Sequence, residues 1–312
     1  MSTNNLAARL KSSAVLIAAL VTLGYLDLAF PHPDLPGVWL LPALLFFSLG
    51  TAWDVTRLLI VSGRPLSTPI CLIATGMVTL STCVPLLWPA CGMVYPVDCK
   101  IGHSGWIAVA AVTAVFVVMA NEMARYDGQR RGSIERTMAG AFVALYIGMP
   151  MAMLVLIRQM HADESPTWGL SAVLSMVAIT KSADAGAYFA GKTLGRHKLI
   201  PRLSPGKTWE GAVGGMITAT IVAALCLRFL IPAIGEPDGG SAGPWWSALV
   251  LGPVLMIAGL LGDLAESLIK RDAGAKDSGD WLPGLGGVWD VSDSILAASM
   301  PAYVLFAAGL AG

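Results

Sequence analysis

Long apolar runs separated by short polar segments dominate the hydrophobic pattern of this chain. A helix needs roughly 20 mostly apolar residues to cross the hydrocarbon core of a bilayer. We expect nine membrane-spanning helices, at about 12–30, 36–53, 67–89, 104–121, 137–157, 167–183, 211–232, 245–262 and 294–311. Gly, Pro and Ser interrupt several runs, which bundled spans tolerate because neighbouring helices satisfy the freed backbone groups. The pattern predicts an all-α integral membrane protein.

Composition supports this interpretation. The 312 residues are 55% hydrophobic and only 13% charged, and the mean hydropathy is +0.69. A soluble domain usually carries about 25% charged residues, so a large soluble core is excluded. The first apolar run is longer than the core of a signal peptide and no cleavage-type site clearly follows it. We therefore interpret it as a retained first span.

The distribution of basic residues predicts the topology. With a cytoplasmic N-terminus and nine alternating spans, seventeen of the 20 Lys and Arg residues fall in cytoplasmic segments. The exceptions are Lys100 and Arg158 in outer loops and Arg228 near the outer end of a span. Because cytoplasmic loops are enriched in Lys and Arg, we expect the N-terminus inside and the C-terminus outside. The loop with Cys91 and Cys99 then faces outward, where a disulfide or two free thiols are both open.

Two of the predicted cytoplasmic loops mix both charge signs with Gly and Ser. They are KSADAGAYFAGKTLGRHKLIPRLSPGKTWEG, residues 181–211, and GDLAESLIKRDAGAKDSGDWLPGLGGVWDVSD, residues 262–293. The other inner loops are mostly Arg, as expected of simple topology signals near anionic lipid. We therefore divide the chain into an N-terminal bundle of six spans, 1–180, and a catalytic transmembrane domain, 181–312.

The second loop gathers carboxylates at the predicted membrane surface: Asp263, Asp277, Asp280, Asp290 and Asp293. Such groups repel one another unless a cation or proton joins them, and Mg²⁺ prefers oxygen ligands together with substrate phosphates. Glycines at 284, 286 and 287 would let backbone N–H groups approach a polyphosphate. A solvated, charge-balanced connector is the alternative. Glu266 and Lys270 are four residues apart, so we expect an ion pair that supports a helix there.

The first loop ends in SPGKTWEG, where Ser204 and Lys207 are candidate phosphate donors. The spacing of a Walker A loop is absent. The alternative interpretation of this stretch is a Pro-Gly turn followed by Trp209 as an interfacial anchor.

Taken in order, these residues resemble a known signature. Ser267-Leu-Ile-Lys270-Arg271, Lys276-Asp277, Leu282-Pro283-Gly284, Gly286-Gly287 and the block Asp290 to Asp293 are similar to the motif of phosphatidate cytidylyltransferases, or CDP-diacylglycerol synthases. DAGAYFAGKTLGRHKL and SPGKTWEG resemble that family's preceding cytoplasmic segment. The similarity covers about residues 180–298 and is only general before that.

The resemblance implies that CTP and phosphatidate react to give CDP-diacylglycerol and pyrophosphate, with Mg²⁺ required and a second monovalent or divalent cation left open. It assigns metal binding to Asp263 and Asp290, with Asp277 and Asp293 close behind. It places the basic and catalytic positions at Lys270, Arg271, Lys276 and Asp277. Substrate-binding positions are Ser204, Lys207, Thr208, Ser267, Gly286 and Gly287. The nucleophile is a phosphate monoester that is largely dianionic at neutral pH, so it needs no general base.

The chain departs from the family pattern at two positions. Leu285 stands where the family commonly has His, and Val291 stands where it has Arg. Phosphate would then be held more weakly there, or by His197 or Lys198. Three alternatives therefore stay open: transfer to another lipid phosphate or a polyprenol-type acceptor, a transporter, and a catalytically silent paralogue.

We expect a multi-pass protein of the inner (cytoplasmic) membrane with its active site on the cytoplasmic side and no nucleic-acid partner. A homodimer is neither required nor excluded.

Overall fold

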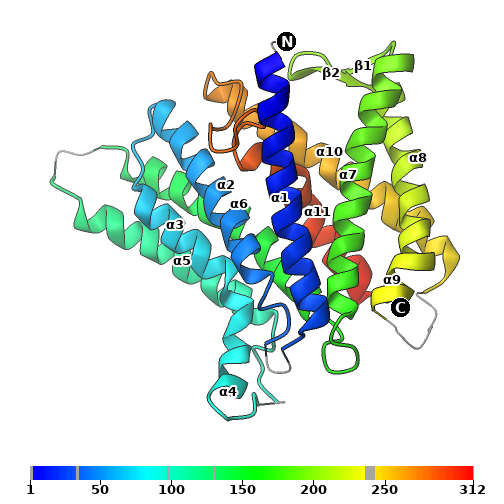
Figure 1. The fold of residues 1–312 in the computed structure, drawn as a ribbon. Coiled ribbons are helices and arrows are strands. Elements are labelled where there is room, and N and C mark those ends of the chain that lie inside the picture. The colour runs from blue at the N-terminus through cyan, green and yellow to red at the C-terminus, as the bar shows by residue number, and fades with distance from the viewer. Residues whose placement is uncertain (1–2, 33–34, 97, 129–130, 236–242, 312) are drawn as a thin grey trace. The chain divides into compact units, whose positions relative to one another are not determined.

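The computed structural model of the chain is built almost entirely of helices (Figure 1). It describes residues 3–32, 35–96, 98–128, 131–235 and 243–311. Among these residues the long helices are α1 (Thr3–Ala29), α2 (Leu41–Val61), α3 (Thr68–Thr79), α5 (Gly105–Ala124), α6 (Ser133–Gln159), α7 (Trp168–Leu194), α8 (Trp209–Leu225), α10 (Ala248–Asp272) and α11 (Trp289–Ala307). Short helical turns are η1 (Ser81–Leu86), α4 (Leu87–Ala90), η2 (Cys226–Leu230), α9 (Ile231–Ile234) and η3 (Trp245–Ser247). A helix therefore occupies each of the nine segments that the hydrophobic pattern predicts.

Six helical segments in the described part of the chain are long and apolar enough to cross a membrane. They are 8–29 in α1, α2, α5, α6, 209–234 and 245–272. The pair formed by α3 and the turn after it, bent by 54°, makes a seventh if it counts as one span. Neither α7 nor α11 is among these six. Polar and charged residues at one end of each helix, such as Asp184 and Asp293, shorten its apolar part. The chain is thus a multi-pass membrane protein, and nine spans stay a prediction.

The chain divides into two compact units, and the first contains residues 1–26, 32–156 and 272–292. Its core lies where α3, α5 and α6 meet, and the buried residues there are small: Ala74, Val78, Ala114, Val118 and Ala144. A Cβ atom on Gly148 of α6 would lie 2.7 Å from the Cβ atom of Val78. Small residues let helix backbones approach closely where lipid provides no hydrophobic driving force for association.

The same unit contains the loop with Cys91 and Cys99. Both are free thiols, as are the other three cysteines of the chain, all of which lie among the described residues. The Tyr95 hydroxyl donates a hydrogen bond to Cys99 Sγ over 3.1 Å. Of the two alternatives left open for this loop, the structure has the pair of free thiols.

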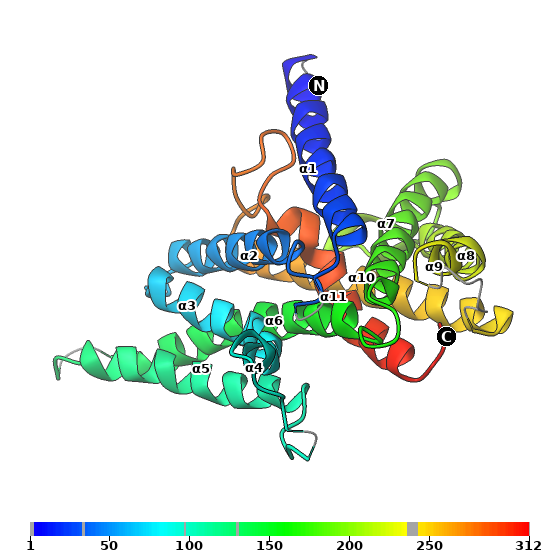
Figure 2. The same ribbon diagram turned by 60° about the horizontal axis from the view of Figure 1, so that its bottom comes forward.

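The second unit contains residues 27–31, 157–271 and 293–312. Within it α7 and α8 lie side by side along much of their length (Figures 1 and 2). A hairpin connects them: β1 (Lys198–Ile200) pairs antiparallel with β2 (Ser204–Thr208), so that Lys198 lies opposite Thr208. The described chain is nearly all α-helical, as predicted, and this hairpin is the departure from that prediction. Its strands are short and lack the alternation of apolar and polar residues that would have indicated them.

Two glycines bring α10 close to its neighbours in the second unit. A Cβ atom on Gly262 would lie 2.5 Å from the carbonyl oxygen of Asp293 and 2.7 Å from Ala297 Cβ, both in α11. A Cβ atom on Gly259 would lie 3.1 Å from Thr180 Cγ2 of α7. Because the backbones of α10 and α11 nearly touch at Gly262, the polar residues that follow Gly262 come next to Asp293.

We expect Gly262→Ala to lower the free energy of unfolding by about 1–3 kcal/mol, because the obstructing atom belongs to the backbone and cannot rotate away. The measurement is the thermal transition of the detergent-solubilised protein by fluorescence-detected size exclusion. Gly24→Ala in α1 is the matched control, since a Cβ atom there meets nothing within 4 Å. Equal transitions for the two variants would contradict the close crossing.

Candidate active site

Three carboxylates converge in the second unit. Asp263 and Glu266 lie on α10 and Asp293 lies on α11, and their oxygens come within 4.8 Å of one another. Asp263 and Glu266 are three residues apart and so share one face of the helix. Glu266 and Asp293 are buried, and Asp263 is partly exposed. A group of hard oxygen donors at this spacing is suited to a divalent cation.

Two lysines neutralise part of this charge. Lys207 of β2 lies 2.9 Å from an oxygen of Asp263 and also donates to the carbonyl of Leu260 over 3.3 Å. Lys270 pairs with Glu266 over 3.1 Å one helical turn away, which confirms the predicted i,i+4 contact. This contact exists because α10 continues to Asp272, well beyond the predicted end of the span. The hairpin therefore has a clear positional role, since it carries Lys207 to the carboxylates.

A polar chain extends from this group along α7. Lys181 donates to Ser294 Oγ over 2.7 Å, and Ser294 donates to Asp184 over 3.1 Å. Burial raises the pKa of Asp293 to about 6; the Lys181 ammonium opposes this shift, and the Asp263 and Asp184 carboxylates add to it. Burial likewise raises the pKa of Asp184, against the effect of Lys181. A cation bound at these carboxylates would favour their ionised forms.

Asp290 has a different set of partners, which include Ser278 and Gly287 of the first unit. One of its oxygens accepts hydrogen bonds from Ser278 N over 3.1 Å, Ser278 Oγ over 2.8 Å and Gly287 N over 2.7 Å. Gly286 has φ of +99°, and a Cβ atom there would collide with the same oxygen. Asp290 therefore holds both ends of the glycine-rich loop 278–287 to the start of α11.

Asp54 of α2 supports the same loop and was not foreseen. It is buried, and it accepts a hydrogen bond from Trp289 N over 3.2 Å. Side chains on Gly279 or Gly287 would collide with its carboxylate. The one signal in the sequence is a carboxylate directly after the apolar run 36–53, because ionisable groups at membrane depth are often functional.

The remaining predicted site residues differ in exposure. Arg271, Lys276 and Asp277 are exposed, at the end of α10 and in the loop after it. Ser204 and Ser267 are half-buried, and Gly287 is buried. Thr208 is buried and caps α8, where its hydroxyl accepts from Gly211 N over 3.1 Å.

His197 is paired with a carboxylate of α8. Its ring lies 2.6 Å from Glu210, which also accepts hydrogen bonds from the backbone N–H groups of Arg196 and His197. These contacts fix the hairpin to the first turn of α8. They give His197 a structural role, and phosphate binding by His197 stays a prediction.

The sequence is similar to a known protein family and to known proteins. The model of the cytidylyltransferase family matches residues 15–308. Phosphatidate cytidylyltransferase of Haemophilus influenzae is 39% identical over 142 residues, 46% of this chain and 48% of that protein. The enzymes of the same name from Brucella suis and Bacillus subtilis are 42% and 38% identical over 166 and 165 residues, each alignment covering 53% of this chain and 55% and 56% of the relative. The chain thus spans about half the length of the curated relatives it matches.

Asp54→Ala should loosen loop 278–287, because it leaves the buried N–H of Trp289 without its acceptor at a cost of about 1–3 kcal/mol. We expect faster chymotrypsin cleavage after Trp281, followed by mass spectrometry of the fragments. Asp272→Ala is the matched control, since its ion pair with Arg64 is exposed and 3.4 Å long. Unchanged cleavage in Asp54→Ala would mean that the loop does not depend on this carboxylate.

Proposed function

The chain belongs to the cytidylyltransferase family, and from this premise we propose that it transfers the cytidylyl group of CTP to phosphatidate. An oxygen of the lipid phosphate attacks the α-phosphorus of CTP. The bond from that phosphorus to the oxygen bridging the β-phosphate breaks, giving CDP-diacylglycerol and pyrophosphate. The names of the relatives support this reaction.

The observation that carries the proposal is the group of Asp263, Glu266 and Asp293 with Lys207 and Lys270 at its edge. The attacking group is an anion and so is its target. The main requirement is therefore to neutralise charge and align the two phosphates. A phosphate monoester with a second pKa near 6 is already a nucleophile, so a proton-abstracting residue is not needed.

The residues of this group fit Mg²⁺ as the cofactor. We assign its ligands to Asp263, Glu266 and Asp293, because their oxygens already lie within one coordination shell of each other. A divalent cation there supplies neutralisation of phosphate oxygens and a template for orienting them. Asp277 and Asp290 stay proposed ligands by family pattern alone. The three hydrogen bonds to one Asp290 oxygen favour a positioning role for that residue.

We assign phosphate binding to basic and small residues of the two polar segments, 181–211 and 262–293. Lys207 and Lys270 extend to the carboxylates, and Ser204 precedes Lys207 on β2. Arg271 and Lys276 are exposed and free to meet a dissolved nucleotide. Ser267, Thr208, Gly286 and Gly287 complete the proposed substrate set, with Thr208 acting through the cap of α8.

The topology completes the proposal. Nine spans with the N-terminus inside place both polar segments, 181–211 and 262–293, at the cytoplasmic face of the inner membrane. The distribution of basic residues supports this arrangement. Residues 181–312 then contain the chemistry, and 1–180 form the remaining bundle. The proposal needs no nucleic-acid partner, and it holds for a monomer or a homodimer.

A changed acceptor is the second candidate. Leu285 and Val291 replace a titratable and a basic group of the family pattern, which favours a lipid phosphate that needs less positive charge around it. Turnover with another lipid phosphate or a polyprenyl phosphate, and none with phosphatidate, would support this second reaction.

Purified protein with CTP, Mg²⁺ and phosphatidate should release pyrophosphate, and chelation of the metal should stop the release. Asp263→Asn should reduce the rate by at least about 100-fold, because it removes a charged oxygen ligand. Asp272→Asn, nine residues further along the same helix and exposed, should keep the parent rate. Near-parent rates in Asp263→Asn would show that the metal site is misplaced, and absence of turnover with every lipid phosphate would contradict enzymatic function.

A further inference from the structure

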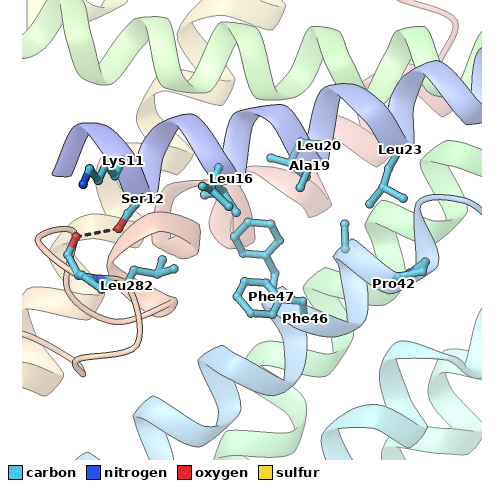
Figure 3. Close-up of a pocket in the computed structure, with 13 residues that line it drawn as sticks. Lys11, Ser12, Leu16, Ala19, Leu20, Leu23, Pro42, Phe46, Phe47 and Leu282 are labelled. Carbon is cyan, nitrogen blue, oxygen red and sulfur yellow. Dashed lines mark hydrogen bonds between the residues drawn. The ribbon is translucent and has the colours of Figure 1, made fainter. Parts of the chain in front are cut away.

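An apolar groove lies between α1 and α2 in the first unit, with a volume of about 520 Å³ (Figure 3). Its walls are hydrocarbon for most of its length. The lining residues are Val15, Leu16, Ala19, Leu20 and Leu23 of α1 and Pro42, Ala43, Phe46 and Phe47 of α2. Its volume falls in the range of small-molecule sites.

The sequence of α1 explains why the groove has one apolar wall. Ser12, Leu16, Ala19 and Leu23 recur at intervals of four, three and four residues, so they form one stripe along the helix (Figure 3). Ala19 is the smallest apolar side chain of this stripe, and it leaves room opposite the two phenylalanines. Phe46 and Phe47 pack edge to face, with ring centroids 5.5 Å apart, which gives the opposite wall a defined shape.

One end of the groove is polar and closed by the glycine-rich loop. Ser12 donates to the carbonyl of Pro283 over 2.9 Å, and Lys11 lies beside it (Figure 3). Gly284 lies against α1 so closely that a Cβ atom would be 2.6 Å from Arg9 Cγ. The groove therefore ends on the loop that carries Asp277, Gly286 and Gly287.

A second, polar cavity of about 370 Å³ continues from that end. Leu282 and Pro283 line both cavities. Arg9, Asp277 and Asp280 line only the polar one, together with residues 284–286. The apolar groove and the polar cavity together suit an amphiphile, whose hydrocarbon chain would lie in the groove and whose ionic head would lie in the cavity.

We propose that the groove holds an acyl chain of phosphatidate, with its phosphate monoester on the Arg9 and Lys11 side of the polar end. This inference rests on the proposed function, since it names the lipid site of that reaction. The monoester carries between one and two negative charges, more than the diester of other phospholipids, and two cationic side chains complement it. Asp277 and Asp280 also line the polar cavity and disfavour phosphate beside them.

The position of Arg9 also compensates for Leu285. Both residues line the polar cavity, so the guanidinium supplies positive charge where the family pattern has a histidine. Arg9 lies in α1, more than 270 residues before Leu285, so no local sequence pattern connects the two residues.

The test is photocrosslinking of the full-length protein in lipid nanodiscs with phosphatidate that carries a diazirine on its acyl chain. We expect adducts on residues 15–23 and 42–47, lost on addition of excess phosphatidate and retained with excess phosphatidylcholine. Ala19→Phe fills the groove and should reduce adduct formation there about tenfold, as expected for overpacking of an apolar site. Ala18→Phe, at the neighbouring position outside the lining, is the matched control and should label as the parent does.

Lys11→Gln provides a second variant that leaves the apolar walls intact, and it should remove the preference for phosphatidate over phosphatidylcholine as competitor. Equal competition by both lipids in the parent protein would identify ordinary bilayer lipid and overturn the proposal. Pyrophosphate release from the same preparations separates the two proposals. Turnover without groove adducts rejects the groove alone, and specific adducts without turnover support the lipid site while rejecting the reaction.

Discussion

Repulsion among three carboxylates is the constraint on which the candidate site depends. Asp263, Glu266 and Asp293 lie within 4.8 Å of one another, and two like charges 4 Å apart cost about 4 kcal/mol at an effective dielectric constant of 20. Three ionised carboxylates this close are stable only when positive charge lies beside them. Lys207 and Lys270 supply part of it, from a hairpin and from the next turn of the same helix. The remaining deficit of positive charge is what makes the group a plausible cation site.

That constraint explains the elements around the site. The hairpin β1–β2 is the one sheet in the described chain, and it positions Lys207. The glycines of α10 remove side chains where α11 crosses, so that Asp293 can approach Asp263. The extension of α10 to Asp272 places Lys270 one turn beyond Glu266. The glycines thus bring the carboxylates together, and the hairpin and the extension of α10 bring the lysines that compensate them.

Local patterns in the sequence predicted much of this, and long-range packing hid the rest. Apolar runs gave a helix at all nine predicted segments, and the spacing of Glu266 and Lys270 gave their ion pair. The same spacing argument places Asp263 and Glu266 on one face, yet Glu266 was interpreted only as helix support. Its place beside Asp293 depends on the close contact at Gly262, which no periodicity encodes. Asp54 acts on a loop more than 220 residues away, so only the fold could reveal it.

The glycine-rich loop takes its shape from acceptors outside it. Asp290 and Asp54 bind backbone N–H groups of Ser278, Gly287 and Trp289, and Leu282 and Gly286 pair through their own backbone. Within the loop, the Ser278 hydroxyl adds a side-chain hydrogen bond to Asp290, and the other contacts named here are made by the backbone. Position 285 can therefore change its chemistry while the chain path stays the same, which makes this loop a place where acceptor preference can evolve without refolding.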